Sequence, residues 1–114
     1  MMVFTMSTVV LFYTTFSSKE EALKVTEVLL EKKLIACANI MAESTSIYRW
    51  KDQVETTKEV PTLLKSTTEN RAAIEDCVIE LHSYDVPCII ELKVENGHKE
   101  FLDWIIKETH FETN

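Results

Sequence analysis

Two side chains in the second half of the chain have the chemistry of soft metal ligands. His82 and Cys88 stand close together in the sequence, and an imidazole nitrogen and a thiolate sulfur both suit copper or zinc. A closed metal site needs more than two ligands, and the nearest other Cys, Cys77, lies on the apolar face predicted for the preceding helix. We therefore expect either a weak site to which a neighbouring copy adds ligands, or a histidine that caps a helix end by bonding to the backbone.

The remaining residues show none of the usual catalytic arrangements. The chain has a single glycine, so it cannot form a Gly-rich loop around a phosphate. Its three histidines lie apart, and no nucleophile stands beside a base. An acylphosphatase-like enzyme would carry glycine and arginine in the loop after its first strand, but residues 15–18 are TFSS. We interpret the protein as a non-enzyme that requires no cofactor.

Charge and hydropathy narrow the possible partners. The formal net charge is -7 and the pI is about 4.9, so nucleic acids and anionic membrane surfaces are repelled on average. No apolar run approaches the roughly 20 residues of a membrane-spanning helix. Residues 1–16 contain no Lys or Arg, which disfavours a signal peptide. We expect a cytoplasmic protein that binds neither nucleic acid nor membranes.

The three cysteines show no sign of a redox or zinc element. Cys37, Cys77 and Cys88 are widely spaced and form no Cys-x-x-Cys pair. Free thiols usually pack as small apolar groups. We predict that all three are buried and unpaired.

Hydrophobic periodicity predicts the order strand, helix, strand, strand, helix, strand, helix. The segments are residues 8–14, 17–32, 34–50, 54–66, 68–81, 90–94 and 99–109. Within the third segment, residues 34–41 and 46–50 are extended and could form one long, bent strand. This order is that of an α+β, ferredoxin-like βαββαβ sandwich with an extra C-terminal helix. We expect one domain over residues 8–110, with tails at 1–7 and 111–114.

Local signals mark where the first helix begins and where the long hairpin turns. Ser18 is followed three residues later by Glu21, the spacing in which a hydroxyl and a carboxylate satisfy free amides at a helix start. A turn is expected over residues 51–53, where Asp52 tolerates left-handed backbone. Pro61 cannot donate a ladder hydrogen bond, which predicts an edge position or a bulge.

Two aromatic side chains indicate an interface. Tyr48 and Trp50 point to the same side of their strand, because side chains alternate between its faces. Large aromatics dominate the energy of buried contacts between proteins. The predicted sheet also has helices on one face only, and a small domain buries a limited share of its surface. We therefore predict self-association, with Tyr48 and Trp50 at the oligomer interface.

Several strings of residues together resemble the CutA family of divalent-cation tolerance proteins, over roughly residues 9–109. The strings are residues 34–39 (LIACAN), 46–51 (SIYRWK), 59–60 (EV), Lys65, 82–87 (HSYDVP) and 101–104 (FLDW). The resemblance implies a ferredoxin-like fold assembled as a tight homotrimer, in which long strands pair across subunits. It further implies a role in tolerance of, or response to, divalent metal ions, copper in particular.

The resemblance also places a ligand cleft between subunits. Its residues would be Trp50, Glu59, Lys65 and Tyr84, where a cation and a carboxylate near aromatic walls could hold a small polar or anionic ligand. Some bacterial members of the family carry a cysteine in the first strand and a second histidine before the one matching His82.

Here those two positions are Tyr13 and Leu81, so two potential copper ligands are missing. Two functions follow from the sequence. The first is a trimeric protein of divalent-metal tolerance that binds Cu(II) or another divalent cation weakly. The alternative is a small-ligand sensor or adaptor protein that uses the cleft without a physiological metal.

Overall fold

The computed structural model describes residues 8–109. The tails expected at 1–7 and 111–114, and His110 at the end of the expected domain, lie outside the described residues. The elements are β1 (Val9–Phe16), α1 (Lys19–Glu31), β2 (Cys37–Ile40), β3 (Ser44–Trp50), β4 (Gln53–Thr67), the short 3-10 helix η1 (Thr68–Asn70), α2 (Arg71–Leu81), β5 (Ile89–Lys93) and α3 (Lys99–Glu108). The predicted α+β fold with a third, C-terminal helix is confirmed.

The sheet has the strand order β2-β4-β1-β5, and β3 also pairs with β4. Every pairing is antiparallel, and the order is that of the split βαβ arrangement. The predicted long strand over 34–50 is in fact two strands, because residues 41–43 leave the ladder between β2 and β3. Residues 34–36, predicted as extended, precede β2 and are buried without being part of a strand.

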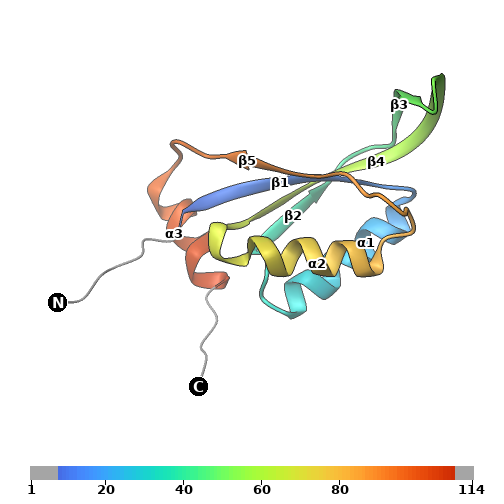
Figure 1. Ribbon diagram of the computed structural model, residues 1–114. Helices are drawn as coiled ribbons and strands as arrows, with labels where there is room; N and C mark the ends of the chain where they lie inside the picture. Colours follow the sequence, from blue (N-terminus) through green and yellow to red (C-terminus); the bar gives the residue numbers. More distant parts are fainter. Residues whose placement is uncertain (1–7, 110–114) are drawn as a thin grey trace.

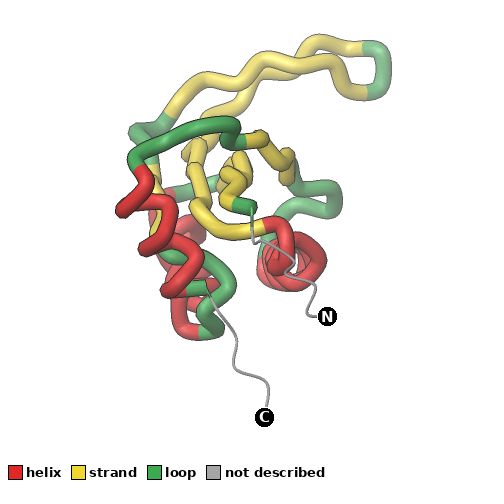
Figure 2. The backbone as a smooth tube through the Cα atoms, turned by 90° about the vertical axis from the view of Figure 1, so that its left-hand side faces the viewer, coloured by secondary structure: helices red, strands yellow, loops and turns green. Residues whose placement is uncertain are grey.

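β3 and the facing half of β4 form a hairpin that projects from the body of the protein, and we call residues 44–59 the arm (Figure 1). Figure 2 shows the two strands of the arm leaving the body together and ending in a turn. At its tip, Lys51 and Asp52 have φ angles of 49° and 64°, and Trp50 pairs with Gln53. Two left-handed residues match the right-handed twist of the flanking strands. The left-handed backbone predicted at Asp52 is confirmed, and Lys51 shares it.

Of the two positions predicted for Pro61, the edge is wrong and the bulge is confirmed: the register against β4 shifts by one residue between Ile40–Thr62 and Ser44–Glu59, so residues 41–43 face only residues 60–61. β4 is a central strand, and Pro61 pairs in regular register with Thr15 of β1. On its other side the carbonyl of Pro61 accepts a hydrogen bond from the Met41 amide, at the break between β2 and β3. Since the N and O atoms of one residue point to the same side of a strand, the missing N–H of Pro61 faces that break. No ladder hydrogen bond is therefore lost.

α1 and α2 lie together on one face of the sheet and form the main core (Figure 1). The largest fully buried side chains of this core are Val10, Phe12, Phe16, Val25, Leu29, Ile35, Leu64, Ile74 and Val78. The helix start predicted at Ser18 is confirmed, since its Oγ accepts a hydrogen bond from the Glu21 amide at 3.1 Å. The Glu21 carboxylate in turn accepts hydrogen bonds from the Ser17 amide and the Ser83 amide, which joins α1 to the end of α2.

The opposite face of the sheet is covered by a helix at one end only. There α3 packs Ile105 against Val9 and Ala36. Between this end and the arm lies an apolar region that we call the open face, over which no helix of residues 8–109 packs. Its side chains come from cross-strand pairs of β1 with β4 and β5, and they are Leu11, Tyr13, Leu63, Ile90 and Leu92. Ile90 and Leu92 are 51% and 41% exposed, so this face is a surface that self-association could bury.

Candidate functional site

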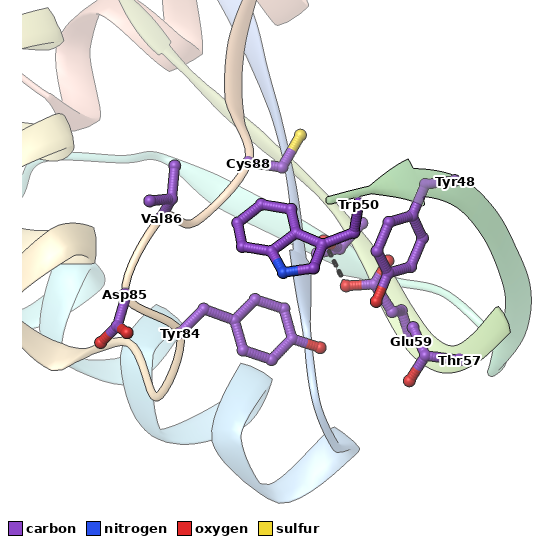
Figure 3. Close-up of a pocket in the computed structure, with 9 residues that line it drawn as sticks. Tyr48, Trp50, Thr57, Glu59, Tyr84, Asp85, Val86 and Cys88 are labelled. Atoms are coloured by element: carbon purple, nitrogen blue, oxygen red, sulfur yellow. Dashed lines mark hydrogen bonds between the residues drawn. The ribbon is translucent and has the colours of Figure 1, made fainter. Parts of the chain in front are cut away.

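A pocket of about 440 Å³ lies where the arm meets the loop between α2 and β5. Its lining residues are Thr15, Tyr48, Trp50, Thr57, Glu59, Tyr84, Asp85, Val86 and Cys88. Figure 3 shows side chains from the arm on one side of the hollow and side chains from residues 84–88 on the other. The volume is within the range of small-ligand pockets.

The register of the arm explains why its lining residues converge. Ser44 pairs with Glu59, Ser46 with Thr57, and Tyr48 with Glu55. Directly paired residues share a face and alternate residues do too, so Tyr48, Trp50, Thr57 and Glu59 all point to one side of the arm. The shared side predicted for Tyr48 and Trp50 is thereby confirmed.

Glu59 is the charged centre of the pocket. The hydroxyl of Thr15 donates a hydrogen bond to Glu59 Oε2 at 3.0 Å. Burial, a hydrogen bond to Glu59 and the charge of that carboxylate raise the pKa of Tyr84 to about 12. Burial and the same carboxylate also raise the pKa of the Cys88 thiol. The phenol and the thiol therefore stay protonated at neutral pH, and the potential in the pocket is negative.

His82 lies behind the pocket and holds its loop in place. The ring is buried, stacks on Phe16 with centroids 5.0 Å apart, and contacts Tyr84 at 4.7 Å. Its Nδ1 accepts a hydrogen bond from the Tyr84 amide at 3.0 Å, so the proton of the neutral ring is on Nε2. That Nε2–H donates to the carbonyl of Thr15 at 2.7 Å. This geometry matches the alternative of a backbone-bonded histidine at a helix end.

The predicted metal ligands do not form a metal site within one chain. Both ring nitrogens of His82 are engaged in hydrogen bonds, and burial and the Glu59 carboxylate raise the pKa of the Cys88 thiol, so a metal ion at this pair would have to displace a hydrogen bond and a proton. Among residues 8–109, no three His, Cys, Asp or Glu side chains gather closely enough to hold a metal ion.

The structure brings together three of the four residues predicted for the ligand cleft. Trp50, Glu59 and Tyr84 line the pocket, together with the predicted interface residue Tyr48 and the predicted metal ligand Cys88. Lys65 is not among the lining residues.

The ammonium group of Lys65 instead donates to Asn39 Oδ1 and lies 5.7 Å from the centre of the Phe101 ring. Because Phe101 belongs to α3, Lys65 sits near the end of the open face that is remote from the arm. Lys65 therefore does not contribute its positive charge to the pocket of its own chain.

Sequence reasoning missed four lining residues: Thr15, Thr57, Asp85 and Val86. Thr57 could have been found by the alternation that groups it with Glu59, and Asp85 and Val86 by their place directly after Tyr84. Thr15 had no signal, since only the folded sheet brings β1 beneath the arm.

The expectation of three buried thiols is wrong for two of them. Cys77 is on the buried side of α2, but Cys37 and Cys88 are half-buried. Cys37 pairs with Lys65 on the side of the sheet away from α1 and α2, and Cys88 lines the pocket. All three are free thiols. None of the helices described between residues 8 and 109 is long and apolar enough to cross a membrane.

The chain is similar along most of its length to divalent-cation tolerance proteins. The family described as "CutA1 divalent ion tolerance protein" matches residues 10–108. The "Divalent-cation tolerance protein CutA" of Pyrococcus horikoshii is 40% identical over 100 residues, which are 88% of this chain and 97% of that protein.

Solved structures show the same likeness in three dimensions. The crystal structure of divalent ion tolerance protein CutA1 from Ehrlichia chaffeensis matches with a TM-score of 0.87 at 34% identity, over 94% of this chain and 100% of that one. The structure of the periplasmic divalent cation tolerance protein CutA from Archaeoglobus fulgidus also gives a TM-score of 0.87, at 39% identity, over 90% and 99% of the two chains. The likeness extends over nearly the whole chain in both cases.

Proposed function

The chain belongs to the CutA1 divalent ion tolerance protein family, and on that premise we propose that it acts in divalent-cation tolerance as a homotrimer that catalyses no reaction. The observation that carries the assembly is the open face, where half-buried apolar side chains of β1 and β4 lie beside the exposed Ile90 and Leu92 of β5. The family resemblance supplies the number three. In such a trimer the open faces of the copies would turn inward and the helices outward.

The arm supports the same assembly. Its exposed apolar residues are Ile47, Tyr48, Trp50 and Val54, of which Ile47 is 71% and Trp50 is 54% exposed. Tyr48 and Trp50 lie on one face of the arm and Ile47 and Val54 on the other, so both faces offer exposed apolar side chains to another copy. A neighbouring copy that receives the arm would bury these side chains and complete the wall of the pocket.

Truncating the aromatic anchor tests this part of the proposal. Trp50→Ala should weaken assembly, because large aromatics contribute much of the energy of an interface. Light scattering over a dilution series should show the mutant dissociating at higher concentration than the parent protein. Arg49→Ala, on the same strand but the opposite face, is the matched control. A mutant trimer that dissociates no more readily than the parent would count against the proposed interface.

Direct copper binding is a separate part of the proposal. Cu(II) or another divalent cation would bind weakly at His82 and Cys88, with ligands added by a neighbouring copy. For a cation to bind there, His82 must release one of its two hydrogen bonds and Cys88 must lose its proton. Titration calorimetry with Cu(II) tests it: the same heat for the parent protein and His82→Ala would remove His82 as a ligand.

We propose the cytoplasm as the location of this protein. The three free thiols support a reducing compartment, whereas the similar Archaeoglobus fulgidus protein is described as periplasmic. Cell fractionation followed by thiol labelling would decide, because an oxidising compartment would leave the half-buried Cys37 and Cys88 unavailable to the reagent.

A second function, sensing of a small ligand, is favoured by one specific observation. Three aromatic rings and a hydrogen-bonded carboxylate converge on one pocket, and such convergence of apolar walls with a few polar groups is typical of ligand sites. Metal binding and ligand sensing would involve different side chains, so titrations with Cu(II) and with a small organic ligand distinguish them.

A further inference from the structure

We propose that the pocket at the base of the arm binds a small organic cation through an alkylated ammonium group, with Glu59 as its counter-charge and aromatic rings as its walls. The inference rests on the ligand-binding role of the cleft proposed above, and it names the class of ligand. It also reverses the sign expected from the sequence, which pointed to a polar or anionic ligand.

The charge of the pocket selects a cation. Of its nine described lining residues, Glu59 and Asp85 are acidic and none is Lys, Arg or His. The cation that the sequence assigned to this cleft, Lys65, lies instead beside Asn39 and Phe101. Within one chain, an anion would therefore meet the Glu59 carboxylate without a compensating charge, and a cation would meet its complement.

The walls of the pocket suit a weakly hydrated cation. Tyr48, Trp50 and Tyr84 all line the hollow, and Figure 3 shows their rings grouped around the Glu59 carboxylate. The face of an aromatic ring carries negative charge and attracts an ammonium group, and several rings together form the cages that recognise methylated ammonium ions. Val86 adds an apolar contact for the alkyl groups.

Glu59 is held ready for such a ligand. Thr15 donates to Oε2 at 3.0 Å. This donor holds the carboxylate in one orientation before a ligand arrives, which lowers the entropy lost on binding. Burial first, and the Glu59 carboxylate second, raise the pKa values of Tyr84 and Cys88; the second of these causes would also stabilise a positive guest.

A divalent metal ion fits the same pocket less well. It would need several oxygen, nitrogen or sulfur ligands at short range, and among residues 8–109 no three His, Cys, Asp or Glu side chains are grouped so that they could hold one.

Choline is a suitable probe, and its uncharged tert-butyl isostere is the control for shape. The indole N–H signals of the full-length, nitrogen-labelled protein report binding by NMR. Trp50 lines the pocket, whereas Trp104 stacks on Phe101 in α3 and serves as an internal reference. We expect the Trp50 signal to shift in a saturable manner with choline while that of Trp104 does not move. The isostere should bind at least about fivefold more weakly, as the loss of cation–π contacts predicts.

A charge-neutral substitution isolates the carboxylate. Glu59→Gln keeps an acceptor for Thr15 and should weaken choline binding about tenfold. Glu55→Gln is the matched control, because Glu55 lies on the same face of the same strand but about 13 Å away along the arm. We expect the control to change the affinity by less than about twofold, as screening at that distance allows.

Three results would overturn the inference: no shift of the Trp50 signal with choline, equal binding of the isostere, or unchanged affinity in Glu59→Gln. A shift of the same signal with Zn(II) but not with choline would also overturn it, and would leave the metal-tolerance proposal standing. Light scattering of the same samples reads the oligomeric state separately. Since a neighbouring copy would complete the wall of the pocket, the choline titration is carried out at concentrations where light scattering shows the assembled protein, and its outcome there decides the inference.

Discussion

A charge placed on the open face should prevent assembly and leave the fold of the protomer intact. Ile90 is the suitable position, because it lies on the edge strand β5, points away from α1 and α2, and is 51% exposed. Ile90→Asp introduces a short carboxylate that cannot extend to solvent as a lysine would. In the monomer this carboxylate is hydrated, and in the proposed trimer it would be buried near its two copies.

The expected loss of trimer stability can be estimated from the half of the Ile90 side chain that is exposed in the protomer. Full burial of such a side chain is worth about 1.5–3 kcal/mol, so the half that remains to be buried contributes about 1 kcal/mol per protomer, or about 3 kcal/mol per trimer. An unpaired buried carboxylate adds a penalty of about 2 kcal/mol or more for each copy, even after water penetrates. The sum is at least about 9 kcal/mol, and at about 1.4 kcal/mol per factor of ten this lowers the association constant by roughly six powers of ten.

The chain offers a closely matched control. Ile79 is 49% exposed on the outer side of α2, so Ile79→Asp makes the same chemical change at nearly the same exposure. It should reduce the stability of the protomer by no more than about 1 kcal/mol, as for other surface substitutions. The predicted trimer should survive it, because the outer side of α2 points away from the open face.

Light scattering coupled to size exclusion, repeated over a dilution series, gives the mass of each variant. Ile90→Asp should elute as a monomer at micromolar concentration, with the circular dichroism of the parent protein, while Ile79→Asp should remain a trimer. If Ile90→Asp stayed trimeric at the same concentrations as the parent, the open face could not be the assembly surface. A monomeric parent protein would refute the trimer itself.

Three further predictions concern the stability of the protomer. Glu21→Gln should lower stability by about 1 kcal/mol at pH 7, and by progressively less as the pH falls: the folded-state pKa of Glu21 is below its usual 4.5, so its contribution is present above that value and is lost as the pH falls through the lower one; equal thermal melts of mutant and parent at pH 7 would contradict this. His82→Leu should cost about 2–4 kcal/mol in urea denaturation, since it removes both hydrogen bonds of the buried ring; a loss below about 1 kcal/mol would mean that the ring does not hold the loop. Thr62→Val should raise the melting temperature, because the buried hydroxyls of Thr62 and its cross-strand neighbour Thr14 have no hydrogen-bond partner within the described part of the chain; a lower melting temperature would indicate a partner such as water.

The elements were predictable because their periodicity reflects burial. α1 has its apolar residues at helical spacing, and these contact the sheet, so pattern and packing agree. β4 was expected over residues 54–66 and is observed as Gln53–Thr67. The break between β2 and β3 was indicated only approximately: the two extended stretches were expected to end at residue 41 and to resume at residue 46, whereas residues 41–43 lie between the strands.

The residues of the site, too, were predictable where the strand pattern determines their position and not where the folded structure alone does. Trp50 and Glu59 were identified by resemblance, and strand alternation explains why they face one pocket. The exclusion of Lys65 could have been anticipated: six residues of extended strand separate it from Glu59, and they span about 20 Å. The role of His82 could not, because its partner is the carbonyl of Thr15, which is 67 residues away in sequence.

Pro61 restricts the register in which β4 can pair with β2 and β3. A slipped pairing would bring residues of β2 or β3 opposite a position that offers no amide proton, and each such misalignment would forfeit a hydrogen bond. The native alignment alone places the imino acid against the gap at 41–43. One proline thus acts as a stop that sets how far the arm reaches, and so where its aromatic side chains meet the residues that follow α2.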